Sequence, residues 1–416
     1  MENQIFKLKK FINKLELNDN NLDKRSSSFN NFYKSGFPSK KLEDWRFIDL
    51  NQIISAKIPN LNFFNELVIS EVNYSKYLEK LQINLKDYNY IIYANGFIKK
   101  IVLEHEIENK IKISRNFNNL SSIKNDSLDN LNDALHFDYI KIEISENYEF
   151  NKPLIIFNIL DDKIGDTNFN IKFDITLGNN SRLSILDFNL NYNKNNLINI
   201  NNNYLLNEGS ILKNYKINIV DNKNLIYSKT NIDLEKNSVS ENFILTLGSE
   251  FSKNEIVCNL KGNYSSAFIN GIMKLNDSKK HEIRSKINHL CENTKSYQLV
   301  KSTLEDEAKS VYQGKIFVDK IAQKTDGYQL SKAILLNEAT EFNGKPELEI
   351  YADDVKCSHG STSGNLDENK IFYLMTRGLN QKEAKKLLLD GFFLEIIEKI
   401  TDLKVKEEIK NLMDIS

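Results

Sequence analysis

The chain has 416 residues, and its 56 Lys and Arg nearly balance its 57 Asp and Glu, which leaves a formal net charge of −1. This balance gives no support to a role at nucleic acid or at a membrane surface, and no apolar run reaches membrane-spanning length. The N-terminus lacks the apolar segment of a secretory signal, and the three cysteines are too few and too widely spaced for a disulfide framework. We therefore expect a globular protein of the reducing cytoplasm.

The N-terminal segment, residues 1–85, is expected to be mostly helical. Gly36 and Pro38 mark a turn within it, and the only tryptophan, Trp45, follows with Phe47 close behind. The simplest interpretation is that Trp45 and Phe47 dock this region on the main body of the protein. Before the turn, apolar residues recur at helical spacing, at Ile5, Leu8, Phe11, Ile12 and Leu15.

Residues 86–362 have the pattern of short β-strands. Helical periodicity is scarce in this region, and alternating apolar runs are broken by Gly and Asn. Examples of such runs are residues 91–98, 173–178 and 243–248. The middle of the chain is therefore predicted to be one long β body.

A weak repeat runs through this β body. A serine follows a Gly or Asn turn and precedes an apolar run at Ser181, Ser210, Ser238 and Ser266, with separations of 29, 28 and 28 residues. A period in this range is typical of stacked units, and units built from short strands favour a β-solenoid, with a β-sandwich as the competing fold. The abundant Asn fits codon bias, and side-chain ladders in a solenoid are a second explanation.

Helical patterns return in residues 363–416. Asp367 stands where a first helical turn favours negative charge, Gly378 interrupts the pattern, and Asn380 with Glu383 resembles a capping box. Helices here would help to cover the sheet edges that an open solenoid leaves. Two apolar faces are expected, one from Ile371, Phe372, Leu374 and Met375, and the other from Ala384, Leu387, Leu388, Phe392, Ile396 and Ile400.

The most informative chemical motif lies just before these helices, where Cys357 and His359 are spaced C-x-H beside Asp353 and Asp354. On a strand, residues i and i+2 share a face, so a thiol and an imidazole would lie close together and suit iron or zinc. Two ligands cannot close a tetrahedral site, so any metal would need donors from a partner or from another segment. His359 is the better ligand candidate, whereas Cys357 is equally well a packed small hydrophobe, and the two aspartates suit a turn.

The other candidate ligands have simpler interpretations. His289 and Cys291 form an H-x-C pair, for which solenoid packing or a surface position is favoured, and Cys258 lies in an alternating run typical of the core. The remaining histidines have no companion at ligand spacing. The sequence also lacks a Gly-rich phosphate loop ending in Lys-Ser/Thr, so nothing indicates ATP chemistry in this chain.

The segment of residues 345–392 runs from KPELEIYADD through VKCSHGSTSG to KKLLLDGF. It resembles the SufB/SufD family of iron–sulfur cluster assembly proteins. Residues 296–336 resemble the same family. The intact Cys-Ser-His-Gly of residues 357–360 and the Gly-Phe-Pro-Ser-Lys-Lys of residues 36–41 are similar to the SufD branch in particular. The resemblance covers most of the chain and is weak between residues 50 and 150.

This resemblance implies a right-handed parallel β-helix flanked by helical regions, and a non-catalytic scaffold subunit. Family members pair with a SufB-type paralogue through the β-helix ends and bind a SufC-type ABC ATPase. No permanently bound cofactor is implied; instead His359, and secondarily Cys357, would meet transient iron or a nascent cluster at the partner interface. The C-terminal helices, with Arg377, Gly378 and Phe392, would dock the ATPase.

Three alternatives stay open at this point. The chain could be a SufB-like subunit that carries the cluster itself, or a passive structural solenoid in which Cys357 and His359 have no metal role. A carbohydrate-active enzyme on a β-helix is less favoured, because such enzymes are usually exported and the sequence shows no export signal. A homodimer in place of the heterodimer is also left open.

Overall fold

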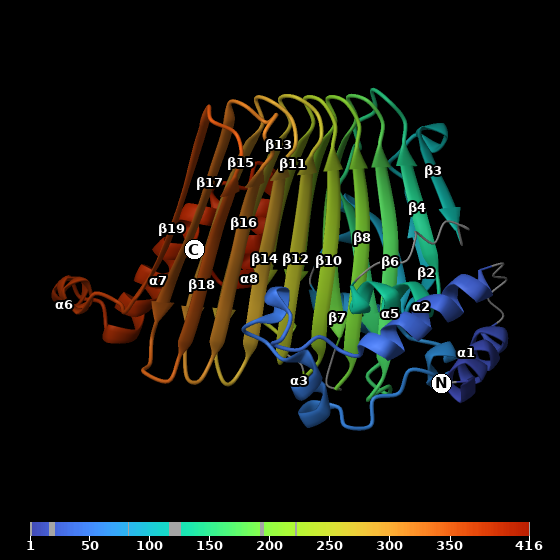
Figure 1. Ribbon diagram of the computed structural model, residues 1–416. Helices are drawn as coiled ribbons and strands as arrows, with labels where there is room; N and C mark the ends of the chain where they lie inside the picture. Colours follow the sequence, from blue (N-terminus) through green and yellow to red (C-terminus); the bar gives the residue numbers. More distant parts are fainter. Residues whose placement is uncertain are drawn as a thin grey trace.

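The computed structural model describes residues 2–15, 21–81, 83–115, 126–191, 195–220 and 223–415. From β4 to β19, consecutive strands alternate between two sheets, so each coil of the chain adds one strand to each sheet, and these strands stack in parallel (Figure 1). The predicted β-solenoid is therefore confirmed, and the competing β-sandwich is wrong. Among the described residues, no helix is long and apolar enough to cross a membrane.

Helices lie before, within and after the strands. The α-helices are α1 (Glu2–Lys14), α2 (Leu22–Ser35), α3 (Leu50–Lys57), α4 (Ser75–Leu78), α5 (Ser127–Leu135), α6 (Glu368–Thr376), α7 (Gln381–Ile397) and α8 (Leu403–Met413). The short 3-10 helices are η1 (Glu43–Trp45), η2 (Glu66–Ile69), η3 (Glu79–Leu81), η4 (Leu85–Asp87) and η5 (Glu108–Lys110).

The first sheet has ten strands in the order β19-β17-β15-β13-β11-β9-β7-β5-β1-β2. Their bounds are β1 (Asn89–Ala94), β2 (Phe97–Val102), β5 (Leu154–Leu160), β7 (Arg182–Asn191), β9 (Ile211–Asn218), β11 (Val239–Thr246), β13 (Ser266–Leu275), β15 (Lys295–Leu304), β17 (Thr325–Leu335) and β19 (Val355–Gly364).

The second sheet has nine strands in the order β18-β16-β14-β12-β10-β8-β6-β4-β3. Their bounds are β3 (Ile111–Arg115), β4 (Tyr139–Ile144), β6 (Asn168–Leu177), β8 (Leu197–Leu206), β10 (Leu225–Leu234), β12 (Phe251–Leu260), β14 (Lys280–His289), β16 (Lys309–Val318) and β18 (Glu341–Ile350). The main apolar core fills the space between the two sheets.

The repeated serines lie in the turns that lead from the second sheet to the first. Ser181, Ser210 and Ser238 are buried, and each hydroxyl donates to the carbonyl oxygen three residues earlier, at 2.6–2.8 Å. In the next coil this position belongs to Ser265, not to Ser266 as predicted, because Ser266 pairs in register with Val239. The sequence offers two adjacent serines there, and spacing alone could not choose between them.

Asparagine ladders run across the coils, which supports the structural explanation for at least part of the Asn content. On the second sheet, the amide of Asn288 donates to Asn259 at 2.7 Å, and Asn259 donates to Asp233 at 2.8 Å. In a second ladder, Asn231 donates to Asn203, which donates to Asp174. Both ladders end in a carboxylate, which can only accept hydrogen bonds and therefore fixes the direction of every amide.

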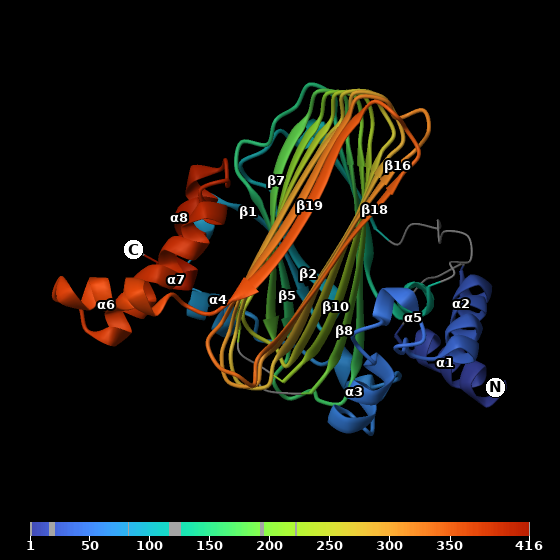
Figure 2. The ribbon, with the colours of Figure 1, turned by 60° about the vertical axis from the view of Figure 1, so that its left-hand side comes forward.

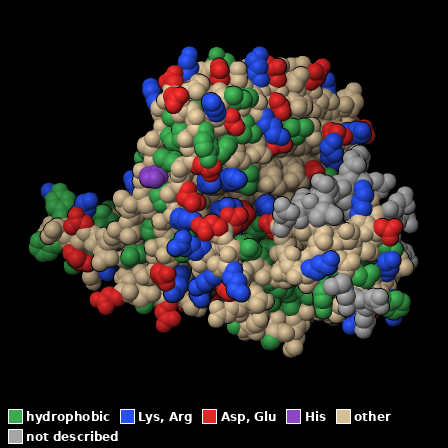
Figure 3. All heavy atoms as spheres, viewed as in Figure 1, with side chains coloured by type: hydrophobic (Ala, Val, Ile, Leu, Met, Phe, Trp, Pro, Cys, Tyr) green, Lys and Arg blue, Asp and Glu red, His purple; other side chains and the backbone are tan. Residues whose placement is uncertain are grey.

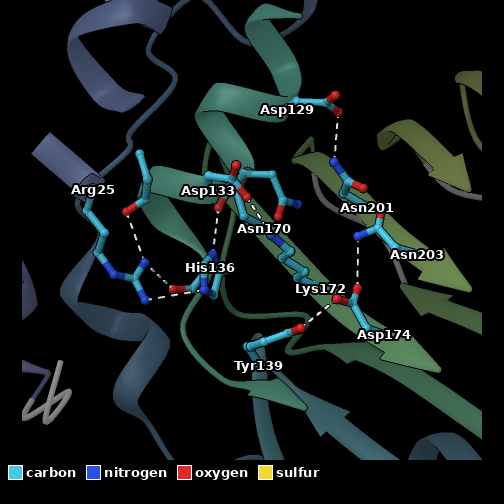
Figure 4. A network of polar contacts seen from close by, with 12 residues as sticks. Arg25, Asp129, Asp133, His136, Tyr139, Asn170, Lys172, Asp174, Asn201 and Asn203 are labelled. Atoms are coloured by element: carbon cyan, nitrogen blue, oxygen red, sulfur yellow. Dashed lines mark hydrogen bonds and ion pairs between the residues drawn. The ribbon is translucent and has the colours of Figure 1, made fainter. Parts of the chain in front are cut away.

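The prediction that helices are scarce in the β body missed α5. All nine of its residues are buried, although five of them are Asn, Asp or Ser. Polar contacts hold it on the second sheet, as Figure 4 shows: Asp133 pairs with Lys172 at 2.6 Å, and Asn201 donates to Asp129 at 2.7 Å. The guanidinium of Arg25 binds the carbonyl oxygen of His136 at the end of this helix, at 2.8 Å.

The N-terminal arm, which is the segment between α2 and α3 that contains η1, lies on the outer face of the second sheet. Trp45 therefore docks on the β body, as predicted. The indole is buried, its ring centroid lies 5.6 Å from that of Tyr227, and the Lys253 ammonium lies 4.3 Å from it. Lys253 donates to the Asp44 carbonyl oxygen at 2.6 Å and to Glu282 at 2.5 Å. Figure 3 shows positive and negative side chains intermixed over this face of the molecule.

The C-terminal helices lie on the opposite side, against the outer face of the first sheet (Figure 2). Ile396, Ile397 and Val405 are buried in an apolar cluster with strand residues such as Phe157 and Phe188. The predicted helix signals are confirmed, because Asp367 caps α6 and Asn380 forms a capping box with Glu383 on α7.

Two histidines are buried inside the solenoid at the ends of β14. His281 contacts the Thr246 hydroxyl at 2.7 Å and the Ser249 carbonyl oxygen at 3.1 Å, and His289 contacts the hydroxyls of Thr294 and Ser296 at 2.7 and 2.9 Å. Burial lowers the pKa of each imidazole to about 4, since a charged ring would lose its hydration. Both side chains are therefore neutral at pH 7.

We expect the free energy of unfolding to fall as the pH drops from about 6.5 towards 4. The pKa of His281 is about 4 in the folded chain and near 6.5 in the unfolded chain, so acid favours the unfolded state. Each histidine would account for about 3 kcal/mol over this range. Urea titrations of the wild type and of His281→Gln at pH 7 and 4.5 would test this. An equal loss of stability in both proteins on acidification would contradict it.

Candidate functional site at the open end of the solenoid

The two ends of the solenoid differ in how their edge strands are protected. At the N-terminal end, β2 and β3 have six and five residues, and both pair antiparallel with their neighbours. Exposed lysines such as Lys99, Lys100 and Lys112 line them, which is a common way to prevent further strand pairing. At the C-terminal end, β18 and β19 have ten residues each and are the last strands of their sheets.

The C-x-H motif lies on β19, which places it at this C-terminal end. Cys357 and His359 pair in register with Gly327 and Gln329 of β17. Ser361, two residues further along β19, points to the same side and accepts a hydrogen bond from the Ser331 hydroxyl of β17 at 2.8 Å. This bond lies in the space between the two sheets, because the Ser361 hydroxyl also approaches Gly344 of β18. Since side chains alternate along a strand, Cys357 and His359 share the face that is turned toward the space between the sheets.

Cys357 is half-buried and packs in a small apolar cluster with Ile316, Leu348 and Val355. Burial raises the pKa of its thiol, so the thiolate that binds metals is disfavoured at neutral pH. In this structure Cys357 has the surroundings of a packed small hydrophobe, which was one of the two interpretations of this residue. Its role as a ligand stays a secondary prediction.

His359 is exposed, in contrast to the buried His281 and His289. Its register neighbour in the preceding coil, Gln329, is fully buried, so the environment changes from core to surface in one coil. Within the described part of the chain, no group of three or more Cys, His, Asp and Glu residues could hold a metal ion. The described residues therefore supply no further Cys, His, Asp or Glu that would complete a metal site at His359.

Asp353 and Asp354 lie in the turn between β18 and β19. The Asp354 amide donates to the Gln323 side chain at 2.9 Å, and its carbonyl oxygen accepts from the Lys324 amide at 2.6 Å. These bonds continue the turn contacts that link earlier coils, such as Asn293 to Gln323. The two aspartates therefore occupy a turn, which was the favoured interpretation.

The weaker candidates have structural surroundings. Cys258 is fully buried in the main core, as predicted. His289 points inside the solenoid, where hydroxyl groups contact both ring nitrogens, whereas the Cys291 thiol donates to the Lys261 carbonyl oxygen at 2.7 Å in the following turn. The H-x-C pair is therefore held by other contacts, in agreement with the packing interpretation.

The predicted docking residues of the C-terminal helices differ in exposure. Arg377 and Gly378 are exposed, and Gly378 takes a positive φ of 100° at the end of α6. Phe392 is half-buried, with the Lys301 ammonium 4.4 Å from its ring centroid. The Phe392 carbonyl oxygen also accepts from Lys301, so this residue packs on the first sheet.

The apolar face predicted for α6 is only partly covered by the protein. Ile371 is buried, but Phe372 is 68% exposed, and Met375 is exposed beside it. Tyr373, which was not among the predicted residues, is also exposed and contacts the Arg377 guanidinium at 3.2 Å. In Figures 1 and 3, α6 projects from the body and carries hydrophobic side chains at its tip. Large exposed apolar groups on a projecting helix are typical of a protein-binding surface.

Taken together, the fold and this site define a β-solenoid with short antiparallel edge strands at one end and, among the described residues, unpaired ten-residue edge strands and an exposed histidine at the other. The SUF system FeS cluster assembly SufBD core domain matches residues 163–392, which is more than half of the chain. The protein therefore belongs to the SufBD family. This confirms the resemblance noted from the sequence.

Individual relatives agree with this family. The chain is 35% identical to SufD of Escherichia coli over 163 residues, which are 39% of this chain and 38% of that protein. It is 44% identical to a SufBD family protein of Synechocystis over 103 residues, or 25% of this chain and 23% of the relative. It is 28% identical to SufD of Plasmodium falciparum over 237 residues, or 55% of this chain and 16% of that protein. The matched regions thus span less than half the length of these relatives.

Proposed function

We propose that this chain is a non-catalytic scaffold subunit of a SUF-type iron–sulfur cluster assembly complex. In that complex it pairs with a SufB-type paralogue and binds a SufC-type ABC ATPase. The observation that carries this proposal is the unpaired C-terminal end of the solenoid, where His359 is exposed without further ligands in the described chain. Iron or a nascent cluster is the cargo of the complex and would be shared with the partner.

Pairing at this end fits the chemistry of the exposed residues. Two ten-residue edge strands present backbone groups that a second solenoid could satisfy, and an interface of that kind can be large and lasting. An imidazole such as that of His359 can bind iron without a counter-charge, and a thiolate of the partner would supply the soft ligand that the packed Cys357 is poorly placed to provide.

Anaerobic co-purification would test the proposed function. We expect the tagged chain, co-expressed with a SufB-type paralogue and a SufC-type ATPase, to recover both proteins in a complex that contains iron and sulfide. The test needs no assumption about the cluster type. Recovery of the chain alone, with no β-solenoid partner under any of these conditions, would contradict the proposal and favour a passive structural role.

A second expectation concerns the ATPase. Removal of the whole C-terminal region would uncover the apolar cluster under α7 and α8, so point substitutions on α6 are the better test. Replacing both Phe372 and Tyr373 with Ala should weaken ATPase binding by at least about tenfold, because exposed aromatic anchors dominate many interfaces. The fold should be unaffected, since neither side chain is buried. Binding would be measured by titration calorimetry with the purified ATPase.

Phe6 offers a matched control for this experiment. It is 68% exposed, like Phe372, but lies on α1, which belongs to the N-terminal helices. Phe6→Ala should leave ATPase binding unchanged. If the α6 variant binds as tightly as the wild type, the aromatic pair of α6 is not the dock, and Arg377 is the next residue to replace.

A further inference from the structure

The acidic residues of the N-terminal arm reach successive coils of the solenoid. Arg284 on β14, Gln313 on β16 and Lys345 on β18 pair in register, so they form one row across three coils of the second sheet. The Arg284 guanidinium binds the Asp44 carboxylate, and the Gln313 amide donates to the Asp44 carbonyl oxygen at 3.5 Å. The Lys345 ammonium binds the Glu43 carboxylate. The arm therefore bridges three coils, and its contacts extend to β18, the last strand of this sheet.

A second anchor of the arm lies further inside the solenoid. Trp45 packs against Tyr227 on β10 and lies beside the Lys253 ammonium of β12. Both strands pair with a neighbour on each side, so this part of the arm rests on coils that are themselves held in place. Because Glu43, Asp44 and Trp45 belong to the same short helix, η1, the buried tryptophan also fixes where the two carboxylates lie.

The last coil, by contrast, is poorly buried. None of the ten residues of β18 or of β19 is buried, whereas most residues of the preceding strand β16 are. Leu348 of β18 and Cys357 of β19 meet in one small apolar cluster with Ile316, so the two strands share this packing. Coils of a solenoid are stabilised largely by adjacent coils, and in the described chain the last coil has such a neighbour on one side only. It is therefore the coil that opens most easily, and contacts with the arm oppose this opening.

We propose that the N-terminal arm acts as a strap that holds the last coil, β18 and β19, against the rest of the solenoid. Glu43 and Asp44 set how often this coil opens, and they thereby control the order of the strand that carries Cys357 and His359. The N-terminal region is coupled to the candidate site in this way, across the outer face of the second sheet. The inference concerns the isolated chain, so its test does not depend on the proposed function.

Amide hydrogen exchange of the isolated chain, followed by mass spectrometry, tests this proposal. In the double variant Glu43→Gln, Asp44→Asn, we expect the amides of β18 and β19 to exchange at least about threefold faster than in the wild type, because the lost ion pairs oppose the opening of this coil. Exchange in β10 should be unchanged. Glu208→Gln is the matched control, because it removes a carboxylate of similar exposure from an ion pair with Lys236, outside the arm and the last coil.

Ionic strength gives a second readout of the same contacts. Salt screens exposed ion pairs, so it should accelerate exchange of β18 in the wild type and have less effect in the double variant. Trp45 fluorescence establishes that the arm stays docked, and Glu43→Gln alone replaces the double variant if it does not. Wild-type exchange of β18 or of β19 in the variant would overturn the inference. An equal acceleration in Glu208→Gln, or an equal effect of salt on both proteins, would overturn it as well.

Discussion

Lys253→Met is expected to destabilise the protein by roughly 3–5 kcal/mol and to release the N-terminal arm. The side chains of Lys253 and Glu282 are both fully buried and lie 2.5 Å apart, so the substitution leaves a carboxylate without its counter-charge. Burial already raises the pKa of Glu282, which shows how poorly this site tolerates an unpaired charge. The same lysine holds the Asp44 carbonyl oxygen and lies over the Trp45 ring.

The only tryptophan makes this effect easy to measure. Trp45 fluorescence reports the docking of the arm, and circular dichroism reports the β body, both during urea unfolding. Lys261→Met is the matched control, since the Lys261–Asp233 pair is largely exposed and should contribute less than about 1 kcal/mol. The double variant Lys253→Met, Glu282→Leu should recover part of the loss, because it removes both charges. Equal stability of Lys253→Met and Lys261→Met would contradict this account.

His359→Ala is expected to lower the iron and sulfide content of the purified complex by at least about tenfold. The imidazole is exposed at the end of the solenoid that we propose to face the partner, so its removal would take away the proposed ligand but little buried surface. The free energy of unfolding should change by less than about 0.5 kcal/mol, and the complex should still form. Cys357→Ser should have a smaller effect on cluster content, because the thiol is already packed among apolar side chains.

The measurement is iron, sulfide and visible absorbance per complex after anaerobic purification. His105→Ala serves as the control, because His105 lies at the opposite end, where it approaches Lys152. A wild-type content of cluster in the His359→Ala complex would make this histidine structural. Loss of the complex itself would show that the residue holds the interface, and the ligand role would then be tested with His359→Gln.

Sequence patterns predicted those parts of the fold that rest on local chemistry. Asp367 and Asn380 indicated where α6 and α7 begin. The first backbone amides of any helix lack partners within the helix, so a capping side chain is needed there whatever the tertiary fold. The serine repeat revealed the coils because four successive turns from the second sheet to the first carry the same buried hydroxyl. α5 was missed although Leu128, Leu131 and Leu135 recur at helical spacing, because the helix is short and the Asn and Asp residues between them resemble the Asn-rich turns of the β body.

The candidate site was predictable in composition but not in exposure. The C-x-H spacing on a strand required Cys357 and His359 to share a face, and they do. Their different surroundings depend on the final coil, where Cys357 meets Ile316 and Leu348 while His359 is exposed. The exposed Phe372 and Tyr373 escaped prediction for a related reason, since an apolar helical face looks the same in sequence whether the chain itself or another protein covers it.

The register of the coils has an evolutionary consequence. Residues 211 and 239 are neighbours in adjacent strands, so an insertion of one complete coil, such as the 28 residues that separate them, adds one strand to each sheet. Each insertion would lengthen the solenoid by only about 4.8 Å and would leave both ends chemically unchanged. A change in coil number would therefore alter the distance between the N-terminal helices and the end that carries His359, while the residues at that end stay the same.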